Sequence, residues 1–587
     1  MEEGLAMARR HEMRLWKRKN RCLWISVAIF VLCGVTAFAQ TPAAAPAAAP
    51  AEPPAQATPA PTAAPAGAAP AMDVPLDIKA AAPPSTDELA KGDPGAVKTG
   101  TVSDVVAADT KKGLTLADLV NQAGQNRIAI NFVWTLITGF LVMFMQAGFA
   151  LVETGLCRAK NANHTMMMNF MVYGFGLFAF WVCGFAIQMG GVGPYTTLGG
   201  GAGLNSEYSI SLFGKNFGLW GTHGFFMTHG GAYDVAAMVM FLFQMVFMDT
   251  ALTIVTGAAA ERWKYAAFAV SSVFMGALTY PLFANWAWGG GWLATLGSNF
   301  GLGHGYSDFA GSGVVHSVGG MTALALSMII GPRIGKYSRR GKPNPMPGHD
   351  IVIVLTGCFI LAFGWFGFNP GSTLAASGNG ALRISSIAVN TMLAGCTGSF
   401  GAILYMWMRY GKPDASMSGN GLLAGLVAIT APSGFVNTVG AAIIGFVAGV
   451  LVCLSVEFIE RVLKVDDPVG AISVHGTNGL WGVISVGLFA DGTSNYGGSW
   501  NGVNGSVTGL FYGDPSQLVA QLIGVSTLVG FVFTFSYVAN WIIDAIIGQR
   551  VSAADELAGL DIPEMGALGY PEFVLKPEPE AVMAAGD

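Results

Sequence analysis

Long apolar stretches separated by short polar segments follow one another from about residue 128 to residue 547. A helix needs about 20 mostly apolar residues to cross a bilayer, and eleven stretches approach that length. The pattern therefore predicts an all-α polytopic membrane protein with eleven transmembrane helices. The expected helices begin near Ile128, Thr165, Ala232, Tyr265, Asp308, Ile351, Ile384, Ser418, Asn437, Val469 and Pro515.

The basic residues of the connecting segments give the helices an orientation. The segments after the first, third, fifth, seventh and ninth helices each carry at least two Lys or Arg, whereas those after the even-numbered helices carry only Lys215 and Arg383. Positively charged loops remain in the cytoplasm. We therefore expect the N-terminal end outside the cell and the tail, residues 548–587, in the cytoplasm.

The first 39 residues have the layout of a targeting sequence. A basic stretch precedes the apolar run LWISVAIFVLCGVTAFA, whose last three residues are small-x-small in type. This layout predicts a secretory signal peptide cleaved before Gln40, and the alternative is an uncleaved signal anchor. Residues 40–127 are then an extracytoplasmic segment, in which an Ala/Pro-rich linker precedes a polar stretch with one short helix near LTLADLVNQAG.

Composition agrees with a membrane domain at residues 128–547 and excludes several other classes. The chain is 52% hydrophobic and 11% charged, whereas soluble domains carry about 25% charged residues. The net charge is −5 and no basic patch occurs, so we expect no nucleic-acid partner. The seven cysteines have no CxxC spacing, so neither a disulfide framework nor a zinc site is expected. No cofactor motif and no nucleophile–base set appear, so the chain does not read as an enzyme.

Two histidines in apolar surroundings are the main candidates for a functional site. His316 lies in GSGVVHSVGG, in the fifth expected helix, and His475 lies in GAISVHGTNG, in the tenth. Eleven helices divide into two repeats of five and one long final helix, and a repeat of five reverses its orientation in the membrane. The histidines are 159 residues apart, about one repeat. We therefore expect them to meet near the bilayer midplane and to line a central path.

The chemistry of two neutral imidazoles limits what such a path can carry. Each ring offers one donor and one acceptor, so a facing pair can share one N–H···N bond. The pair suits a small species that exchanges a proton, and it suits a bare metal ion poorly because metal ions prefer several oxygens. For either histidine alone, the alternative is a core residue bonded to a neighbouring helix; the matched positions favour function.

Aromatic residues gather at the ends of helices that the predicted orientation places outside. Phe243 and Phe247 are four apart, on one helix face, Trp288 precedes three glycines, and GWFGFNPGS carries Phe368 and Ser372. An aromatic cage with a hydroxyl can attract a small cation. The alternative is an interfacial aromatic belt.

At this point the chain resembles a known family, the ammonium transporters (Amt/MEP/Rh), in its bacterial Amt type. The matching strings are ETGLCRAKN, GAAAERWKYAAF, WGGGWLATLG, DFAGSGVVHSVGG, GWFGFNPGS, VDDPVGAISVHG and DELAGLDIPEMGALGYPEF, in family order over about residues 128–573. The resemblance implies an eleven-helix protomer with a five-plus-five inverted repeat, assembled as a homotrimer with one pore per protomer. It also implies a multi-pass protein of the cytoplasmic membrane.

The resemblance assigns roles to individual residues, listed here together. Trp288, Ser372, Phe243 and Phe247 correspond to the outer ammonium-recruitment site, Phe247 and Phe368 to a stacked phenyl gate, His316 and His475 to the twin histidines of the pore, and Asp308 to the acid beside the recruitment site. From its own position Asp308 is an N-cap of the fifth helix. Asp466 and Asp467 resemble an acidic pair before the tenth helix, where capping or tail docking suffices. Asp249 departs from the family pattern and is either a packing residue or a proton site.

Three functions remain open at this level. The first is ammonium transport, in which NH4+ loses its proton near the gate and crosses as NH3. The second is an ammonium sensor that signals through a cytoplasmic partner, such as a PII-type regulatory protein. The third is an Rh-type channel for neutral gas, against which the aromatic and serine residues argue because they suit a cation.

We predict that the mature chain begins at Gln40, because a cleavable signal needs small residues immediately before the cut. Intact-mass spectrometry of the purified protein measures this directly. A mass that includes residues 1–39 would instead identify a signal anchor.

Overall fold

The computed structural model describes residues 114–193, 195–198, 204–228, 235–493 and 499–571. The expected signal peptide, most of the 40–127 segment and the end of the tail (572–587) lie outside these residues. The chain divides after Ile130 into two units, and each is described by itself.

In the first unit the described residues form the beginning of helix α3 (Leu116–Leu156). Asp118 accepts the Thr115 N–H at 2.9 Å, and the Thr115 hydroxyl accepts the Asp118 N–H at 3.3 Å. Such reciprocal bonds satisfy N–H groups that a helix start leaves unpaired. A helix is present at the position expected for a short helix, near residues 114–124, but it is the start of the long helix α3, which begins before the expected Ile128.

The second unit, from Asn131 onward, continues α3 and contains the other expected helices. The second comprises α4 (Ala162–Ala179), the π-helical η3 (Phe180–Gly184) and α5 (Phe185–Met189), and the third is α6 (Val235–Ala259). The fourth comprises α7 (Tyr265–Phe274), the π-helical η7 (Met275–Thr279) and α8 (Tyr280–Trp288), and the fifth joins the π-helical η8 (Ser312–Ser317) to α10 (Val318–Ile330).

The remaining expected helices follow in the same way. The sixth is α11 (Ile351–Phe368), followed by the 3-10 turn η9 (Pro370–Thr373); the seventh is α12 (Asn379–Tyr410) and the eighth is α13 (Ala415–Thr430). The ninth is α14 (Thr438–Phe458) with the π-helical η10 (Ile459–Leu463), and the tenth joins the π-helical η11 (Ile472–Thr477) to α15 (Asn478–Phe489). The long final helix runs through α16 (Pro515–Thr527), the π-helical η13 (Leu528–Val532) and α17 (Phe533–Ile547).

The polytopic helical architecture is confirmed. Within the described part of the chain, nine helices are long and apolar enough to cross a membrane, judged by length and composition. Helix α13 is apolar but has only 16 residues, and the tenth expected helix, made of η11 and α15, is not among the nine. All eleven expected positions are helical, and eleven crossings stay a prediction.

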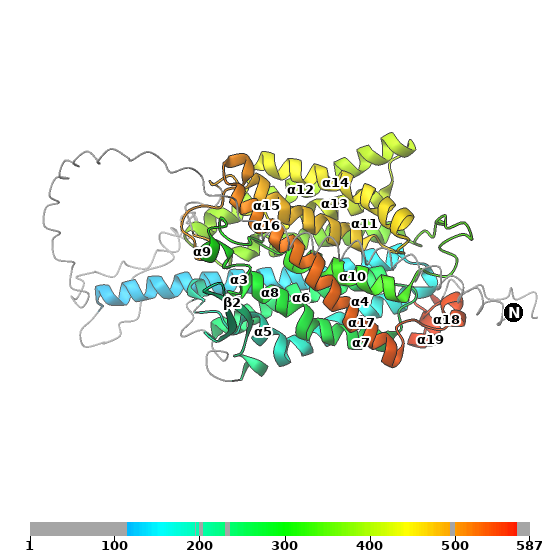
Figure 1. Cartoon of the computed structure of the whole chain (residues 1–587), viewed down its shortest axis with the longest axis horizontal. Helices are drawn as coiled ribbons and strands as arrows, with labels where there is room; N and C mark the ends of the chain where they lie inside the picture. Colours follow the sequence, from blue (N-terminus) through cyan, green and yellow to red (C-terminus); the bar gives the residue numbers. More distant parts are fainter. Residues whose placement is uncertain (1–113, 194, 199–203, 229–234, 494–498, 572–587) are drawn as a thin grey trace, which may run out of the picture. The chain divides into compact units, whose positions relative to one another are not determined.

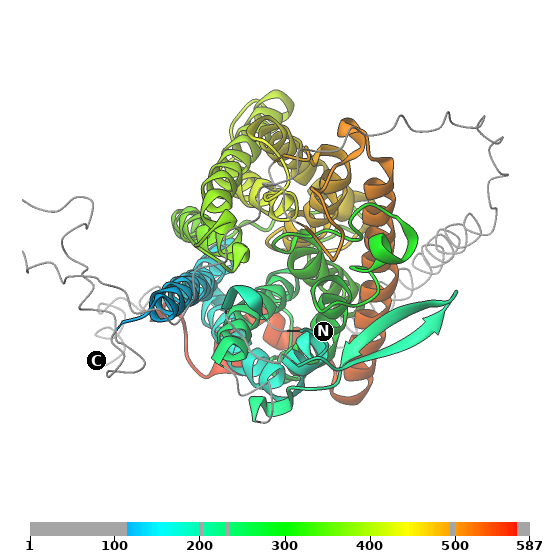
Figure 2. The ribbon, with the colours of Figure 1, turned by 90° about the vertical axis from the view of Figure 1, so that its left-hand side faces the viewer.

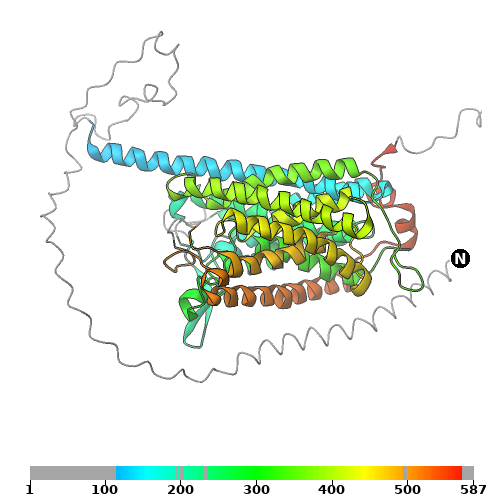
Figure 3. The same ribbon diagram turned by 90° about the horizontal axis from the view of Figure 1, so that it is seen from above.

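The two halves of this second unit form two groups of helices. Figure 1 shows α11–α15 in its upper part and α4–α8 in its lower part. Figure 2, seen along the helices, shows the yellow-green and yellow α12, α13 and α14 together and the cyan and green α4, α6 and α7 opposite them. The long final helix runs beside the others along their length (Figure 3). Helix α10 contacts α6, α17 and η11, so the fifth and tenth helices meet between the two groups.

A β-hairpin interrupts the helical pattern after the second expected helix. Strand β1 (Glu207–Leu212) pairs with β2 (Lys215–Gly221) in an antiparallel ladder that ends at Leu212 opposite Lys215. The two turn residues, Phe213 and Gly214, have φ values of +54° and +69°. Positive φ at both positions belongs to the tight turns that match the twist of a hairpin. The hairpin departs from the all-α expectation, which holds for the helical bundle.

Ion pairs join the loops on the side that we expect to be cytoplasmic. Arg333 binds Asp466 through Nε at 2.9 Å and Glu261 through Nη1 at 3.1 Å, and all three side chains are buried. Glu261 also pairs with Arg158. Burial raises the pKa of Asp466, but the charges of Arg333 and Arg262 outweigh it and hold this pKa well below its usual range. Four connecting segments, those that carry Arg158, Glu261, Arg333 and Asp466, are therefore fixed to one another by charge.

The start of the C-terminal tail packs against helix ends on this same side. The tail contains α18 (Ala553–Ala558) and α19 (Asp561–Met565). Asp561 accepts the His164 N–H at 3.0 Å, and Glu564 accepts the Tyr265 N–H at 2.9 Å. These acceptors satisfy N–H groups in the first turns of α4 and α7. The described part of the tail is thus hydrogen-bonded to the first turns of two helices of the bundle.

We predict that Arg333→Met destabilises the protein by about 3–5 kcal/mol, because it leaves buried carboxylates without their partner. Arg333→Lys, which keeps the charge but loses the paired geometry, is the control and should lose less. Thermal unfolding in detergent provides the comparison. Since the pKa of Asp466 is lowered on folding, its contribution to stability is present above the usual carboxyl pKa of about 4. That contribution is lost as the pH falls further. The difference in stability between wild type and Arg333→Met should therefore become smaller in acid. Equal stability of the two at neutral pH would show that this ion-pair cluster contributes nothing net.

Candidate functional site

Close contact of two backbones brings the fifth and tenth helices together. A Cβ atom placed on Gly320 would overlap the backbone of Gly476, and one placed on Gly479 would overlap the Ser312 carbonyl and the Ser317 hydroxyl. Only glycine permits such an approach, and small residues are the usual means of close helix packing in membranes. The GG and GTNG sequences beside the two histidines therefore determine where these helices cross.

Both histidines lie on π-helical segments capped by an aspartate at the same distance. Asp308 accepts the N–H groups of Gly311, Gly313 and Val314 at 2.8–2.9 Å. Asp467 accepts those of Gly470, Ala471 and Ile472 at 2.7–3.1 Å. Each aspartate precedes its histidine by eight residues. The capping predicted for Asp308 is present, and the same device recurs one repeat later, as the inverted-repeat hypothesis requires.

His316 and His475 meet directly. Their Nδ1 atoms are 3.2 Å apart, and the rings stack at a centroid distance of 5.2 Å and an angle of 24°. Both side chains are buried. One Nδ1 must carry the proton that the other accepts, so the neutral rings are in opposite tautomers. The two Nε2 atoms then present one donor and one acceptor along the path, and His316 Nε2 has no hydrogen-bond partner among the described residues.

A row of aromatic rings leads from the outer residues to this pair. Phe368 stacks on Phe247 at 4.1 Å and 26° and on His316 at 5.4 Å and 26°. Trp365, one turn before Phe368 on α11, stacks on the same histidine at 5.4 Å and 19°. Phe243 continues the row behind Phe247, with centroids 4.7 Å apart. All of these rings are almost fully buried. The predicted gate and the predicted histidines therefore form one connected stack.

Trp288 marks the outer end of the row. Its ring contacts Phe247 edge to face at 6.2 Å, and its Nε1 donates to the Asp308 carbonyl at 2.7 Å. The ring also lies over Gly311, whose φ of +112° excludes most other residues. Trp288 is only partly buried. The structure thus brings Trp288 to Asp308 and the gate.

Ser372 is less directly joined to this set. Its hydroxyl donates to the Phe368 carbonyl at 2.8 Å, one turn back on the chain. The hydroxyl oxygen keeps its lone pairs and can still accept a hydrogen bond. The side chain is partly exposed. Ser372 therefore stands next to the gate residue as an acceptor.

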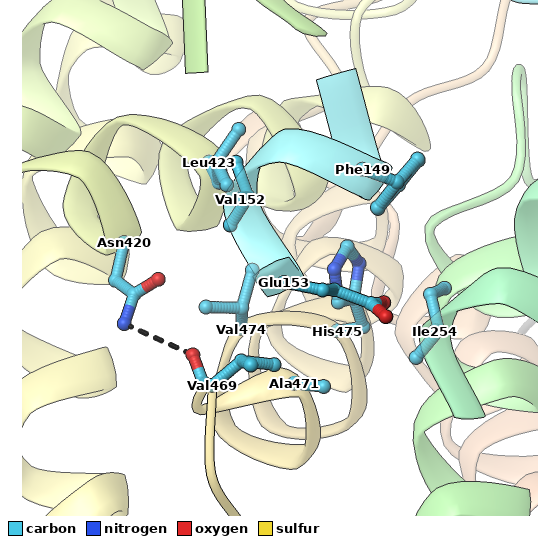
Figure 4. A pocket seen from close by; sticks show the side chains of 10 residues that line it. All are labelled: Phe149, Val152, Glu153, Ile254, Asn420, Leu423, Val469, Ala471, Val474 and His475. Carbon is cyan, nitrogen blue, oxygen red and sulfur yellow. Dashed lines mark hydrogen bonds between the residues drawn. The ribbon is translucent and has the colours of Figure 1, made fainter. Parts of the chain in front are cut away.

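A pocket lies at the other end of the path, below His475. Its walls come from α3, α6 and α13 and from the segment that enters η11 (Figure 4). Phe149 contacts the His475 ring, with centroids 5.8 Å apart, and Glu153 lines the same pocket (Figure 4). The remaining lining residues are Val152, Ile254, Asn420, Leu423, Val469, Ala471 and Val474.

Sequence reasoning did not identify Trp365, Phe149 and Glu153. The sequence does contain a feature that could have identified Trp365: it lies three residues before Phe368 and so on the same helix face. Glu153 could have been identified as an acid within an apolar stretch. Phe149 has none beyond its apolar type.

Asp249 is buried on α6, two residues after Phe247. Its Oδ1 has no hydrogen-bond partner among the described residues. This leaves both interpretations of Asp249, as a packing residue or as a proton site, as predictions.

The described residues contain no group of three or more His, Cys, Asp or Glu side chains suited to a metal ion. A buried, ring-lined path with a pair of neutral bases at its centre is the arrangement of a membrane transport protein.

Comparisons with known proteins agree with this class. The profile of the Ammonium Transporter Family matches residues 133–570. Ammonium transporter Amt2 of Archaeoglobus fulgidus is 44% identical over 451 residues, which cover 76% of this chain and 89% of that protein. Ammonium transporter Amt1 of Haloferax mediterranei is 34% identical, with 77% and 81% covered.

Solved structures show the same fold. A structure titled "Sensor Amt Protein" matches with a TM-score of 0.64 at 32% identity, over 75% of this chain and 99% of that one. The crystal structure of Candida albicans Mep2 matches with a TM-score of 0.62 at 27% identity, over 76% and 92%. The chain belongs to the ammonium transporter family, as the resemblance of its motifs indicated, and that family consists of transporters rather than enzymes.

Proposed function

We propose that this protein carries ammonium across the cytoplasmic membrane, taking up NH4+ on the outside and passing NH3 along the path between the histidines. The observation that carries the proposal is the 3.2 Å contact between His316 and His475 at the end of an unbroken row of rings. Relatives bearing the name ammonium transporter, at 44% and 34% identity, support the choice of solute.

Recruitment begins at Trp288. The face of an indole attracts a cation, with up to about 2 kcal/mol when water is excluded. The Asp308 carboxylate accepts hydrogen bonds from three backbone N–H groups. Its charge therefore stabilises the start of the fifth helix and is not offered to the ion. Ser372 supplies a hydroxyl oxygen that can accept an N–H of the ion.

The stacked rings of Phe247 and Phe368 then obstruct a hydrated ion. A full charge is costly in the apolar middle of a membrane, and NH4+ avoids that cost by leaving its proton near the gate. NH3 both donates and accepts hydrogen bonds, which matches one N–H and one bare nitrogen at the histidine pair. Potassium has no proton to leave, so it is rejected where its water must be removed.

The surroundings of this pathway follow from the family resemblance and remain proposals. They are a homotrimer with one pore per protomer, an N-terminal side outside the cytoplasm after removal of the signal peptide, and regulation by a PII-type protein at the cytoplasmic face. The tail contacts at α4 and α7 support a cytoplasmic surface that a partner could recognise.

A sensor role is the second candidate, and one observation favours it. The structure titled "Sensor Amt Protein" is covered to 99% by this chain at 32% identity. A sensor and a transporter share the recruitment site but differ in flux. Methylammonium uptake by purified protein in liposomes, with ammonium-evoked current recorded in parallel, separates the two: binding without uptake or current would favour the sensor.

We predict that Trp288→Leu raises the half-saturation concentration for methylammonium about ten-fold. The variant loses a cation–π contact of about 1–2 kcal/mol, and a loss of that size weakens binding by about this factor. Trp292→Leu is the matched control, since Trp292 stacks on Phe217 away from the gate. Uptake kinetics over a range of methylammonium concentrations measure both variants. An unchanged half-saturation in Trp288→Leu would assign the residue to an aromatic belt.

We predict strongly non-additive losses in a double-mutant cycle of His316→Ala and His475→Ala, because either truncation breaks the same N–H···N bond. Selectivity should fall together with rate, since a path without imidazoles no longer requires a passenger that exchanges a proton. Ammonium and potassium flux are measured in both single variants and the double variant, after membrane insertion has been checked. Additive losses with potassium still excluded would show that the two rings do not act as a pair.

A further inference from the structure

The charged end of Glu153 lies in a place where a membrane helix rarely keeps an acid. We propose that Glu153 is the group that receives the proton beyond His475 and returns it to the passenger at the inner end of the path. The proposal rests on the transport function proposed above and adds a residue to it.

The position of Glu153 follows from its helix. Phe149 contacts the His475 ring, with centroids 5.8 Å apart, and Glu153 follows it by four residues on α3. Residues four apart share a helix face, so Glu153 faces the same path one turn nearer to Arg158. Glu153 and His475 both line the pocket (Figure 4). A species that enters this pocket from the histidine pair therefore meets Glu153 in the pocket wall.

The charge of Glu153 has no cation to balance it. The side chain is 2% exposed, and the ion pairs of the described residues include none to it: Arg158, in the adjacent loop, pairs with Glu261. The Asp467 carboxylate, itself engaged at the start of η11, adds negative charge to the surroundings of Glu153. An uncompensated carboxylate is costly in an apolar span. Such a group gains from accepting a proton whenever one reaches it.

Hydrogen bonds hold the carboxyl group in place without neutralising it. Asn169 Nδ2 and Thr256 Oγ1 each donate to Oε2 at 2.7 Å. Thr253 donates to Asn169 Oδ1 at 2.7 Å, and Gln146 donates to the Thr253 hydroxyl at 2.8 Å. These donors are neutral amides and hydroxyls that orient the carboxylate and lower its cost. They keep the group accessible to protonation, whereas a salt bridge would fix its charge.

The proton balance of the step is simple. NH4+ gives one proton to the histidine path at the outer side and continues as NH3. The Glu153 carboxylate takes one proton from the side of His475 and becomes the neutral acid. NH3 arriving in the pocket accepts that proton from the acid, which restores the carboxylate and releases NH4+ to the inner side. No other reactant is consumed, and one positive charge crosses for each passenger.

A structural role for Glu153, as the anchor that joins α3, α4 and α6, is the competing account. Glu153→Gln separates the two, because a glutamine oxygen still accepts from Asn169 and Thr256 but the amide carries no exchangeable acid proton. Thr256→Val is the matched control, since it removes one of the same hydrogen bonds and keeps the carboxyl group. Glu153→Asp keeps an acid but withdraws it from the pocket by one methylene.

The experiment records ammonium-evoked current and methylammonium uptake in liposomes, over a range of pH, after thermal unfolding has shown that each variant is folded. We expect Glu153→Gln to lose current about a hundred-fold, the lower end of what a positioned proton-transfer group contributes. Thr256→Val keeps the carboxyl group and the hydrogen bond from Asn169, so we expect it to lose far less current than Glu153→Gln. Glu153→Asp should conduct with a shifted pH profile.

Each result decides between the accounts. Wild-type current in Glu153→Gln, or an equal loss in Thr256→Val, would overturn the proton-acceptor role. If Glu153→Gln fails to insert, an unchanged pH profile in Glu153→Asp would overturn it in the same way. Wild-type protein that shows neither uptake nor current would contradict the transport function itself, so the two failures are distinguishable.

Discussion

The close approach of two backbones at Gly320 and Gly476 is the constraint on which the rest of the structure depends. Any larger side chain at Gly320 would separate the fifth and tenth helices. Two imidazoles on separate helices can share an N–H···N bond only when their Nδ1 atoms come within about 3 Å. The contact between His316 and His475 is therefore a consequence of missing side chains as much as of the histidines themselves. Small residues in these segments, which look featureless in the sequence, determine the geometry of the path.

The second constraint is electrostatic. The helix starts at Asp308 and Asp467 leave N–H groups unpaired in a buried region, and unpaired buried groups cost about 1–3 kcal/mol each. Each aspartate satisfies three of them at 2.7–3.1 Å. The two carboxylates are therefore bound to backbone N–H groups at the two ends of the path. The rings in the middle of the path are neutral. The rings of the row between Trp288 and the histidine pair carry no charge.

The sequence allows the helices and the histidine pair to be predicted because both depend on patterns along the chain. The length of the apolar stretches predicts where the helices lie. The equivalent positions of His316 and His475 in the two repeats predict that the two rings meet. Trp365 and Phe149 could not be predicted, since their roles depend on the neighbours that helix packing supplies. The π-helical turns η8 and η11 likewise lack a sequence signal, because they add a residue to a turn without changing the composition. The β-hairpin was missed although its turn residues include glycine, because the apolar pattern dominated the segments around it.

A path built from neutral groups suits only a solute that can give up its charge as a proton and cross as a neutral molecule. The histidine pair offers a donor and an acceptor at 3.2 Å, and a single proton can change places along it without moving either ring far. A path of this kind needs an acceptor at its end, because a proton that reaches a buried imidazole and stops there leaves an uncompensated charge. Glu153 is the acid that the pocket below His475 provides, and its neutral partners allow it to change charge without rearrangement of the helices. The same low polarity that excludes a hydrated cation from the gate therefore makes a carboxyl group at the inner end effective.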